Sequence, residues 1–229
     1  MNPNDPNIAM VEAVADLLGE MADRFVFVGG CAAGLLITDE ARQSVRATKD
    51  VDLIVEVLSF ASYYTLHDEL KRLGLKEDPD ITCRWHSGSL KLDVMPTVEK
   101  ILGFTNSWYR HAVRLSQRVR LPRGTAINLV SAPIFIATKL EAFQGRGKGD
   151  YGASTDMEDI VAVIDGRQEL IEEVLASSTE IKEYITDEFD SLLGDERFIE
   201  TLSWHLASDV ANQARVSEII TRMRAIAGI

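Results

Sequence analysis

The sequence predicts an α/β domain followed by a helical region, and three observations lead to this prediction. Residues 24–57 have the pattern of a strand, a Gly-Gly turn, a short helix, a connector and a second strand. Residues 81–95 and 118–130 each have the pattern of two strands joined by a turn that contains glycine. Beyond them, apolar residues recur at helical spacing. We therefore expect a core over 1–130 and a helical C-terminal region over 131–229.

Length, charge and composition limit the classes of protein that the chain can belong to. The chain has 229 residues, a formal charge of −12 and 46% hydrophobic residues, enough for one α/β domain and a smaller helical one. We expect a cytoplasmic protein without a membrane partner, because no stretch resembles a membrane span or a leader peptide. Two cysteines, Cys31 and Cys83, make neither a disulfide framework nor a zinc pattern. The acidity argues against a general nucleic-acid coat but leaves room for a local basic groove.

The first elements follow from local patterns. Residues 9–21 place apolar side chains along one side of a helix. Residues 24–28 are β-branched and aromatic, and the diglycine at 29–30 ends this strand abruptly. Residues 31–37 are small and apolar, which suits a helix packed closely on a sheet.

The later elements follow from caps, turn residues and helical spacing. Ser59 and Gly74 are expected to begin and end a helix over 59–73. The expected strands are 81–86, 89–95, 118–122 and 126–130. One expected helix opens at Thr155, with Ser154 or Thr155 as its cap. The other expected helices are 134–143, 169–176, 179–193, 196–207 and 216–227.

The strand over 50–57 carries two carboxylates. Apolar residues alternate strictly with Asp50 and Asp52, so both aspartates should project from the same face. Adjacent carboxylates repel each other, and a divalent cation such as Mg²⁺ removes that repulsion. Gly29-Gly30 precedes a helix, where free backbone N–H groups favour an anion. An anion site beside paired carboxylates suggests a nucleoside triphosphate.

Either pattern alone is usually structural. Asp-x-Asp often lies on a solvated strand edge, and Gly-Gly after a strand is often only a turn. Their order and spacing favour a function. A later strand, Lys91-Leu92-Asp93-Val94-Met95-Pro96, adds one more acid to an otherwise apolar segment, and that acid could equally be exposed or cap a helix.

Gly29-Gly30, then Asp50-x-Asp52, then Asp93 resemble the DNA polymerase β-like nucleotidyltransferase superfamily. The resemblance implies a nucleotidyltransferase fold with a small mixed sheet flanked by helices. It implies that Asp50, Asp52 and Asp93 are catalytic and ligate two Mg²⁺ ions, with Mn²⁺ as a possible substitute. The chain departs from the pattern at Gly30, where many members have serine, so that backbone N–H groups and basic side chains would hold the phosphates.

Arg46-x-Thr48-x-Asp50 also resembles a variant of this superfamily motif. The resemblance implies that Arg46 and Thr48 contribute to nucleotide binding. Arg46 has two interpretations, since an arginine here could grip phosphate or merely neutralise the aspartates.

Residues 108–148 are basic within an acidic chain. They contain eight lysines and arginines against one acid, Glu141. The plainer interpretation is a solvated strand surface. We favour a basic wall that faces phosphates or an RNA acceptor.

A second block consists of Lys139-Leu140-Glu141-Ala142-Phe143, then Arg146, then Asp156-x-x-Asp159. It resembles the abortive-infection nucleotidyltransferase toxins of the AbiEii/AbiGii type, to which the MenT toxins are similar, and this chain would be a short standalone member. The resemblance implies that Lys139 and Arg146 bind nucleotide, with Lys148 in the same flexible basic loop. Which aspartate plays the supporting acidic role, Asp150 or the pair Asp156 and Asp159, stays open.

Each of these residues also has a structural alternative. Lys139 could be an ordinary surface lysine, and Arg146 and Lys148 could lie in an exposed linker. Asp156 and Asp159 could favour a helix N-terminus electrostatically, or orient Lys139 or Arg146. The resemblance implies transfer of an NMP from an NTP to an acceptor hydroxyl. The implied acceptor is RNA, at a tRNA 3′ end, in a toxin-like role with a possible cognate antitoxin. A protein or small-molecule acceptor, an inert nucleotide-binding module and a phosphate-ester hydrolase are the alternatives.

Overall fold

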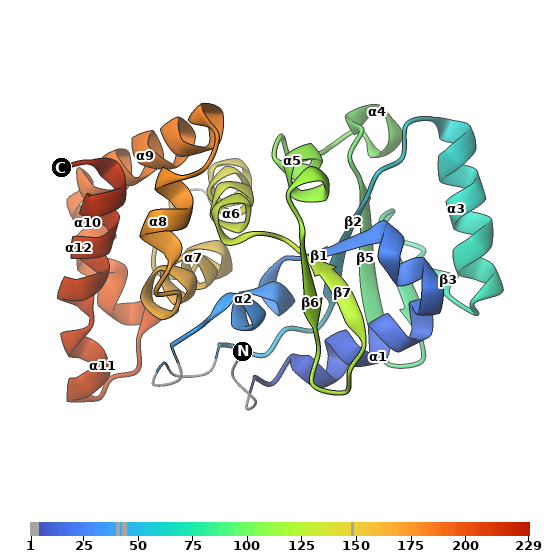
Figure 1. Cartoon of the computed structure of the whole chain (residues 1–229), viewed down its shortest axis with the longest axis horizontal. Coiled ribbons are helices and arrows are strands. Elements are labelled where there is room, and N and C mark those ends of the chain that lie inside the picture. Colours follow the sequence, from blue (N-terminus) through green and yellow to red (C-terminus); the bar gives the residue numbers. More distant parts are fainter. Residues whose placement is uncertain (1–4, 40–41, 43–44, 148) are drawn as a thin grey trace. The chain divides into compact units, whose positions relative to one another are not determined.

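The computed structural model describes residues 5–39, 42, 45–147 and 149–229 (Figure 1). The described residues divide into two compact units. Residues 5–35 and 46–131 form the first, which we call the sheet unit. Residues 36–39, 42, 45 and 132–229 form the second, which we call the helical unit. Lys148 lies outside the described residues.

The sheet unit is built on a mixed seven-stranded sheet in the order β3-β4-β5-β2-β1-β7-β6. The central strands β5 and β2 run parallel, β2 and β1 antiparallel, and β1 and β7 parallel. Such a sheet with its helices confirms the predicted α/β class. The strands are β1 Phe25–Val28, β2 Val51–Val55, β3 Lys76–Glu77, β4 Arg84–Ser87, β5 Leu90–Pro96, β6 Gln117–Arg120 and β7 Ala126–Leu129.

The diglycine joins β1 to a helix as the sequence predicts. Strand β1 is buried along its whole length, and α2, Gly30–Leu36, begins directly after Gly29. Gly29 has φ +70°, a left-handed backbone that side chains disfavour. The chain can therefore turn within one residue from the strand into the helix.

Strand β2 differs from the prediction. Asp50 lies in a bend just before the strand, which begins at Val51. Ile54 shares the alternating face of Asp52 but is fully buried. The strict apolar and polar alternation is therefore wrong as a description of burial, because this central strand is covered on both faces beyond Asp52.

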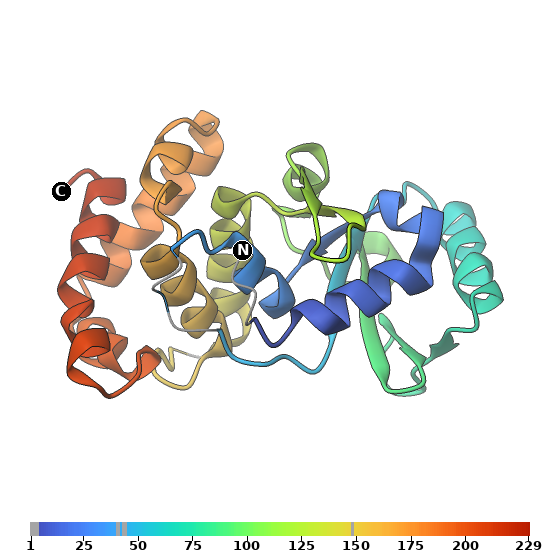
Figure 2. The same cartoon turned by 60° about the horizontal axis from the view of Figure 1, so that its bottom comes forward.

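Five helical segments complete the sheet unit. Helix α1 contacts β2 and β5, and α5 contacts β2 and β1 (Figure 2). Ser59 caps α3 in a capping box with Ser62, as its position predicts. The segments α4, α5 and β3 are short and polar, and the sequence did not indicate them. The bounds are α1 Ile8–Leu18, η1 Gly19–Arg24, α3 Phe60–Arg72, α4 Glu99–Leu102 and α5 Tyr109–Arg114.

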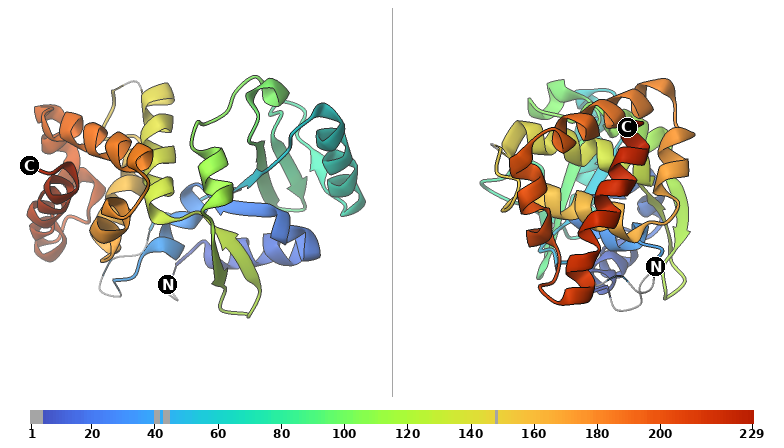
Figure 3. Two further views of the ribbon diagram at one scale, coloured as in Figure 1. Left: turned by 45° about the horizontal axis from the view of Figure 1, so that its top comes forward. Right: turned by 90° about the vertical axis from the view of Figure 1, so that its left-hand side faces the viewer.

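The helical unit contains α6 to α12, drawn from yellow to red in Figure 3. Helices α6 and α7 pack together, and α12 packs on α7 and α9. Ser154 caps α7 by accepting a hydrogen bond from the Met157 N–H. The bounds are α6 Ala132–Arg146, α7 Thr155–Gly166, α8 Leu170–Leu175, α9 Thr179–Leu193, α10 Glu196–Thr201, η2 Leu202–His205, α11 Val210–Ala214 and α12 Val216–Ala227.

A buried ion cluster ties Asp39 and Arg42 to these helices. Asp165 on α7 is 1% exposed at its side chain and pairs with Arg42 at 2.5 Å and with Arg215 at 2.7 Å. Arg215 also reaches Asp39, at 3.0 Å. The N–H groups of Thr38 and Asp39 both donate to the Gly166 carbonyl at 2.9 Å.

Among the described residues, no helix has the length and apolar character needed to cross a lipid bilayer. Cys31 and Cys83 are both buried, and the Cys31 thiol donates to the Val28 carbonyl at 3.1 Å.

Candidate functional site

Three aspartates converge on one face of the sheet unit. In the parallel pair β2 and β5, Asp52 lies beside Asp93. Side chains of laterally paired residues project from the same face of a sheet, so these two carboxylates point the same way. Asp50, in the bend before β2, shares a hydrogen-bonding partner with Asp93. Asp93 therefore lies beside Asp52 in the sheet and is linked to Asp50 through one shared partner, although the three acids are separated along the chain.

That partner is Arg84 on β4. Its Nε donates to Asp93 Oδ1, and its Nη2 donates to Asp93 Oδ2 and to Asp50 Oδ2, each at 2.7 Å. The side chain of Arg84 is 19% exposed, against 14% for Asp93 and 29% for Asp50. Hydrogen bonding to Asp93 raises the pKa of the guanidinium above its ordinary value, so Arg84 stays charged.

Sequence analysis did not single out Arg84, because the expected hairpin turn lies one residue too early. A two-residue turn at Ser87-Gly88 would place Arg84 opposite Lys91. The observed turn is at Gly88-Ser89, which pairs Ser87 with Leu90 and places Arg84 opposite Asp93. Directly opposed residues project from the same face of an antiparallel pair, so this register decides which side chain faces the third acid.

The diglycine bend lies against Asp52. A Cβ atom added at Gly29 would lie 1.8 Å from Asp52 Oδ2, closer than two atoms can approach. Gly29 is thus needed both for its positive φ and for the space that the carboxylate fills. The sequence placed the diglycine and the Asp-x-Asp pair in one site, and the structure brings them into contact.

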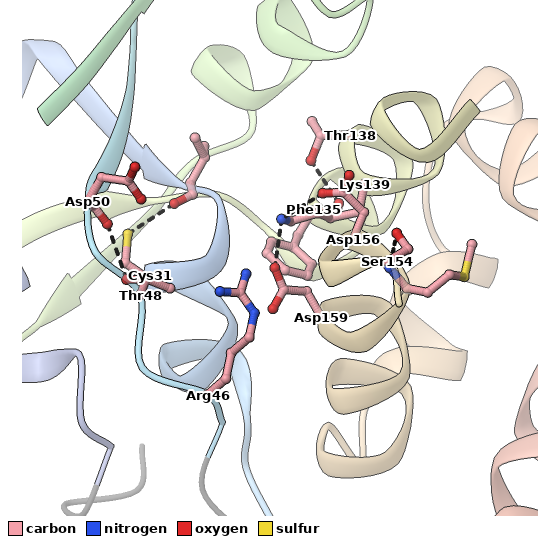
Figure 4. Close-up of polar contacts among 12 residues, drawn as sticks. Cys31, Arg46, Thr48, Asp50, Phe135, Thr138, Lys139, Ser154, Asp156 and Asp159 are labelled. Carbon is pink, nitrogen blue, oxygen red and sulfur yellow. Dashed lines mark hydrogen bonds and ion pairs between the residues drawn. The ribbon is translucent and has the colours of Figure 1, made fainter. Parts of the chain in front are cut away.

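Thr48 supports the bend that carries Asp50. Its hydroxyl donates to the Asp50 carbonyl at 3.1 Å, and its N–H donates to Asn7 Oδ1 at 2.8 Å (Figure 4). The amide of Asn7 also donates to the Arg46 carbonyl at 3.0 Å. These bonds fix the backbone from which Asp50 projects, and nucleotide contacts of Arg46 and Thr48 stay predictions.

Carboxylate oxygens are the ligands that Mg²⁺ prefers. As the described residues stand, no group of three or more Asp, Glu, His and Cys side chains is arranged to hold a metal ion. Arg84 Nη2 lies within 2.7 Å of oxygens from both Asp50 and Asp93, so one cationic nitrogen already occupies a position shared by two carboxylates. The carboxylates are thus donors of the chemical type that a divalent cation takes, and in this arrangement the guanidinium holds the position that two of them share.

The helical unit holds a second cluster of charges. Lys139 is 6% exposed, and its Nζ lies 3.1 Å from Asp156 Oδ1 and 2.7 Å from Asp159 Oδ2 (Figure 4). Arg146 donates to both oxygens of Asp156 at 2.8 Å. The possibility that the two aspartates orient Lys139 and Arg146 is thus realised in these contacts. Lys139 is not the surface lysine of the plainer interpretation.

Asp156 is ionised in this cluster. Burial raises the pKa of its carboxyl, but the hydrogen bond from Arg146 and the charge of Lys139 outweigh burial and lower the pKa below its ordinary value. Asp150 has a different role, because it accepts the Ala153 N–H at 2.9 Å within a turn. A cavity of about 290 Å³ opens beside these residues, lined by Arg146, Gly147, Asp150, Ala153, Ser154, Thr155 and Asp156.

Part of the basic stretch is neutralised within the sheet unit. Arg118 pairs with Asp23 at 2.7 Å, and Arg123 pairs with Glu12 at 3.2 Å. Arg120 donates to the Gly124 carbonyl at 2.7 Å. These arginines stabilise the β6–β7 hairpin and its neighbours, and an RNA contact by this stretch stays a prediction.

No protein-family model and no curated protein sequence matches the chain. Solved structures that resemble it include the following two. One is an antigenic nucleotidyltransferase-like protein from Paracoccidioides brasiliensis, with 17% identity and a TM-score of 0.46 over 88% of this chain and 93% of that chain. The other is a nucleotidyltransferase candidate from H. pylori, with 12% identity and a TM-score of 0.47 over 97% of this chain and 93% of that chain.

Proposed function

We propose that this protein is a Mg²⁺-dependent nucleotidyltransferase that moves an NMP from an NTP to an acceptor hydroxyl. One observation carries the proposal. Asp93 pairs laterally with Asp52, which lies against Gly29, and Arg84 links Asp93 to Asp50 in the bend before β2. A third acid on the neighbouring strand is what a two-metal phosphoryl-transfer site would use, and it supports this function over a solvated Asp-x-Asp edge.

In this proposal the three carboxylates would bind Mg²⁺ and so position the nucleotide for attack. Bound Mg²⁺ would supply charge neutralisation at the phosphates. Asp93 accepts the proton of the acceptor hydroxyl, whose oxygen forms a bond to the α-phosphorus while the bond to pyrophosphate breaks. Thr48 fixes the bend of Asp50, and Gly29 gives Asp52 its place. Most of the rate gain would come from positioning.

Lys139 and Arg146 are proposed as phosphate contacts. Arg146 is the more accessible of the two, with a side chain that is 69% exposed against 8% for Lys139. A guanidinium held from one side by Asp156 can still present its other N–H groups to an anion. We therefore assign the direct contact to Arg146 and an electrostatic contribution to Lys139.

We propose RNA as the acceptor, at a tRNA 3′ end, with a toxin-like role and a cognate antitoxin. The basic stretch over 108–148 supports this choice through its eight lysines and arginines against one acid. A protein or a small hydroxylated molecule is the alternative acceptor.

One observation favours a second candidate function, an inert nucleotide-binding module. Arg84 holds Asp50 and Asp93 in ion pairs, an arrangement that would serve a site with no catalytic metal. In such a module, nucleotide would bind and no bond would be broken.

The test is to incubate the purified protein with each α-labelled NTP, Mg²⁺ and either total RNA or cell lysate. We expect label in an RNA band, and its loss in Asp50→Asn with the circular-dichroism spectrum unchanged. Full transfer by Asp50→Asn would refute the metal assignment. Mg²⁺-dependent NTP binding without label transfer to any acceptor would support the inert module, and phosphate release without an acceptor would indicate a hydrolase.

A further inference from the structure

Arg84 is placed where a shared cation of the aspartate site would be. A single nitrogen, Nη2, contacts Asp50 Oδ2 and Asp93 Oδ2 at 2.7 Å, and Nε holds the remaining oxygen of Asp93 at the same distance. Both oxygens of Asp93 and one oxygen of Asp50 are therefore engaged by one guanidinium. These are oxygens that a divalent cation would need in the proposed function.

We infer that Arg84 competes with the divalent cation for Asp50 and Asp93, so that the cation is bound only when Arg84 leaves them. This inference rests on the proposed function for the identity of the metal ligands. It assigns to Arg84, which no sequence motif marked, control over the occupancy of the site.

The displaced guanidinium needs a new anion. Charge-assisted hydrogen bonds to a carboxylate are strong, and releasing two carboxylates without replacement would be costly. Phosphate is the natural replacement, because arginine grips a phosphate as it grips a carboxylate, through two parallel N–H groups. A nucleotide brings such a phosphate with its cation. Cation and nucleotide should therefore bind cooperatively, and the cation alone should bind weakly.

The side chain can make this exchange. Arg84 lies on β4, which is next to the edge strand β3, and its side chain is 19% exposed. A long side chain can change rotamer at a partly exposed position without moving its strand. The strand itself stays fixed by its pairing with β5, which includes Trp85 beside Leu92.

The experiment measures Mn²⁺ binding to the full chain, by electron paramagnetic resonance of free Mn²⁺, with and without a non-hydrolysable nucleoside triphosphate. The variants are Arg84→Met, which keeps the apolar stem, and Arg84→Lys, which keeps a charge. Arg118→Met is the matched control, since Arg118 also pairs with an aspartate on this sheet unit, Asp23, at 2.7 Å.

Without nucleotide, we expect Arg84→Met to bind Mn²⁺ about tenfold or more tightly than the wild type, because the competing charge-assisted bonds are gone. Arg84→Lys should lie between the two, and Arg118→Met should match the wild type. Nucleotide should tighten Mn²⁺ binding in the wild type far more than in Arg84→Met. Equal or weaker Mn²⁺ binding by folded Arg84→Met would overturn the inference.

A second measurement needs no variant and covers the case in which Arg84→Met does not fold. The Arg84 Nε–H is hydrogen-bonded to Asp93, so its NMR signal reports the ion pair. We expect this signal to shift when Mg²⁺ and the nucleotide analogue are added together, and to move little with Mg²⁺ alone. An unchanged signal at saturating Mg²⁺ and nucleotide would equally overturn the inference.

The two proposals fail separately. Tighter Mn²⁺ binding in Arg84→Met without label transfer by any variant would support the inference and refute the transferase. Label transfer by the wild type together with unchanged Mn²⁺ affinity in Arg84→Met would refute the inference alone.

Discussion

Arg84 and Asp93 face each other across the β4–β5 hairpin, and the guanidinium binds both carboxylate oxygens at 2.7 Å. This pair joins β4 to the aspartate cluster. It also offsets part of the negative charge of the proposed site, because one guanidinium pairs with two of the three carboxylates.

Asp93→Asn should lower both activity and stability. The substitution leaves the Arg84 guanidinium without its bidentate partner, and we expect a loss of about 1 to 3 kcal/mol in the free energy of unfolding. Asp23→Asn, which breaks the more exposed pair with Arg118, should cost less than about 1 kcal/mol. Urea denaturation of both variants measures the difference, and equal losses would show that the Arg84 pair is no stronger than a surface pair.

Gly29→Ala should be far more harmful than its backbone angle alone explains. Gly29 and Gly74 have φ of +70° and +84°, so alanine strains both, by about 1 kcal/mol or more. At Gly74 an added Cβ meets nothing within 4 Å, whereas at Gly29 it meets Asp52 Oδ2 at 1.8 Å. The difference in thermal stability between Gly29→Ala and Gly74→Ala therefore measures the cost of the clash between the added Cβ and Asp52.

The collision also has a consequence for activity. Because Asp52 must move in Gly29→Ala, we expect label transfer to fall by orders of magnitude while Gly74→Ala transfers normally. Similar activity in the two variants would mean that the contact between Gly29 and Asp52 has no role in transfer.

Lys139→Met should destabilise the helical unit. It would leave the carboxylates of Asp156 and Asp159, which are 2% and 1% exposed, without their shared cation. Breaking a buried ion pair in this way costs about 3 to 5 kcal/mol. Urea denaturation measures this cost, and the double variant Lys139→Met with Asp159→Asn should regain part of it.

Arg146→Met provides the contrast within the same cluster. Its side chain is 69% exposed and Asp156 keeps its pair with Lys139, so we expect a smaller loss of stability than in Lys139→Met. Nucleotide affinity, measured by equilibrium dialysis, should fall if Arg146 contacts phosphate. Unchanged affinity would remove Arg146 from the nucleotide site.

His205 should make stability depend on pH. Burial lowers the pKa of its imidazole below 6.5, and its Nε2 lies 2.8 Å from the Tyr151 carbonyl. Because the unfolded chain binds the proton more readily, stability is fully present above pH 6.5 and is lost as the pH falls towards the folded-state pKa. Urea denaturation between pH 7 and 5 should show a shallower decline in His205→Gln, and an identical decline would exclude His205 as the cause.

Sequence patterns were sufficient where the signal is local. The diglycine turn, the Ser59 and Ser154 caps, and the two hairpins follow from residue types within a few positions of each other. The helices 179–193 and 216–227 have the predicted bounds because their apolar spacing is regular.

Sequence patterns did not predict burial or ion pairing where these depend on residues from other elements. Asp50 falls outside β2 and Ile54 is buried because the flanking strands and helices cover this central strand. The ion pairs of Arg84 and Lys139 join residues from different elements, so no single stretch contains them. The sequence indicated the β4–β5 hairpin but not its register, because the observed turn at Gly88-Ser89 lies one residue later than the expected turn at Ser87-Gly88.

The Asp165 cluster decides how this chain can be cut. A fragment that begins at Ala132 would lack residues 36–45, and with them the guanidinium of Arg42 and the carboxylate of Asp39. Such a fragment would carry a sequestered negative charge on α7 with one of its two arginine counter-ions gone, and Gly166 would lose the two amides that bond its carbonyl. Dissection at the apparent boundary should therefore yield an insoluble product, and a workable excision has to graft residues 36–45 onto the excised helices.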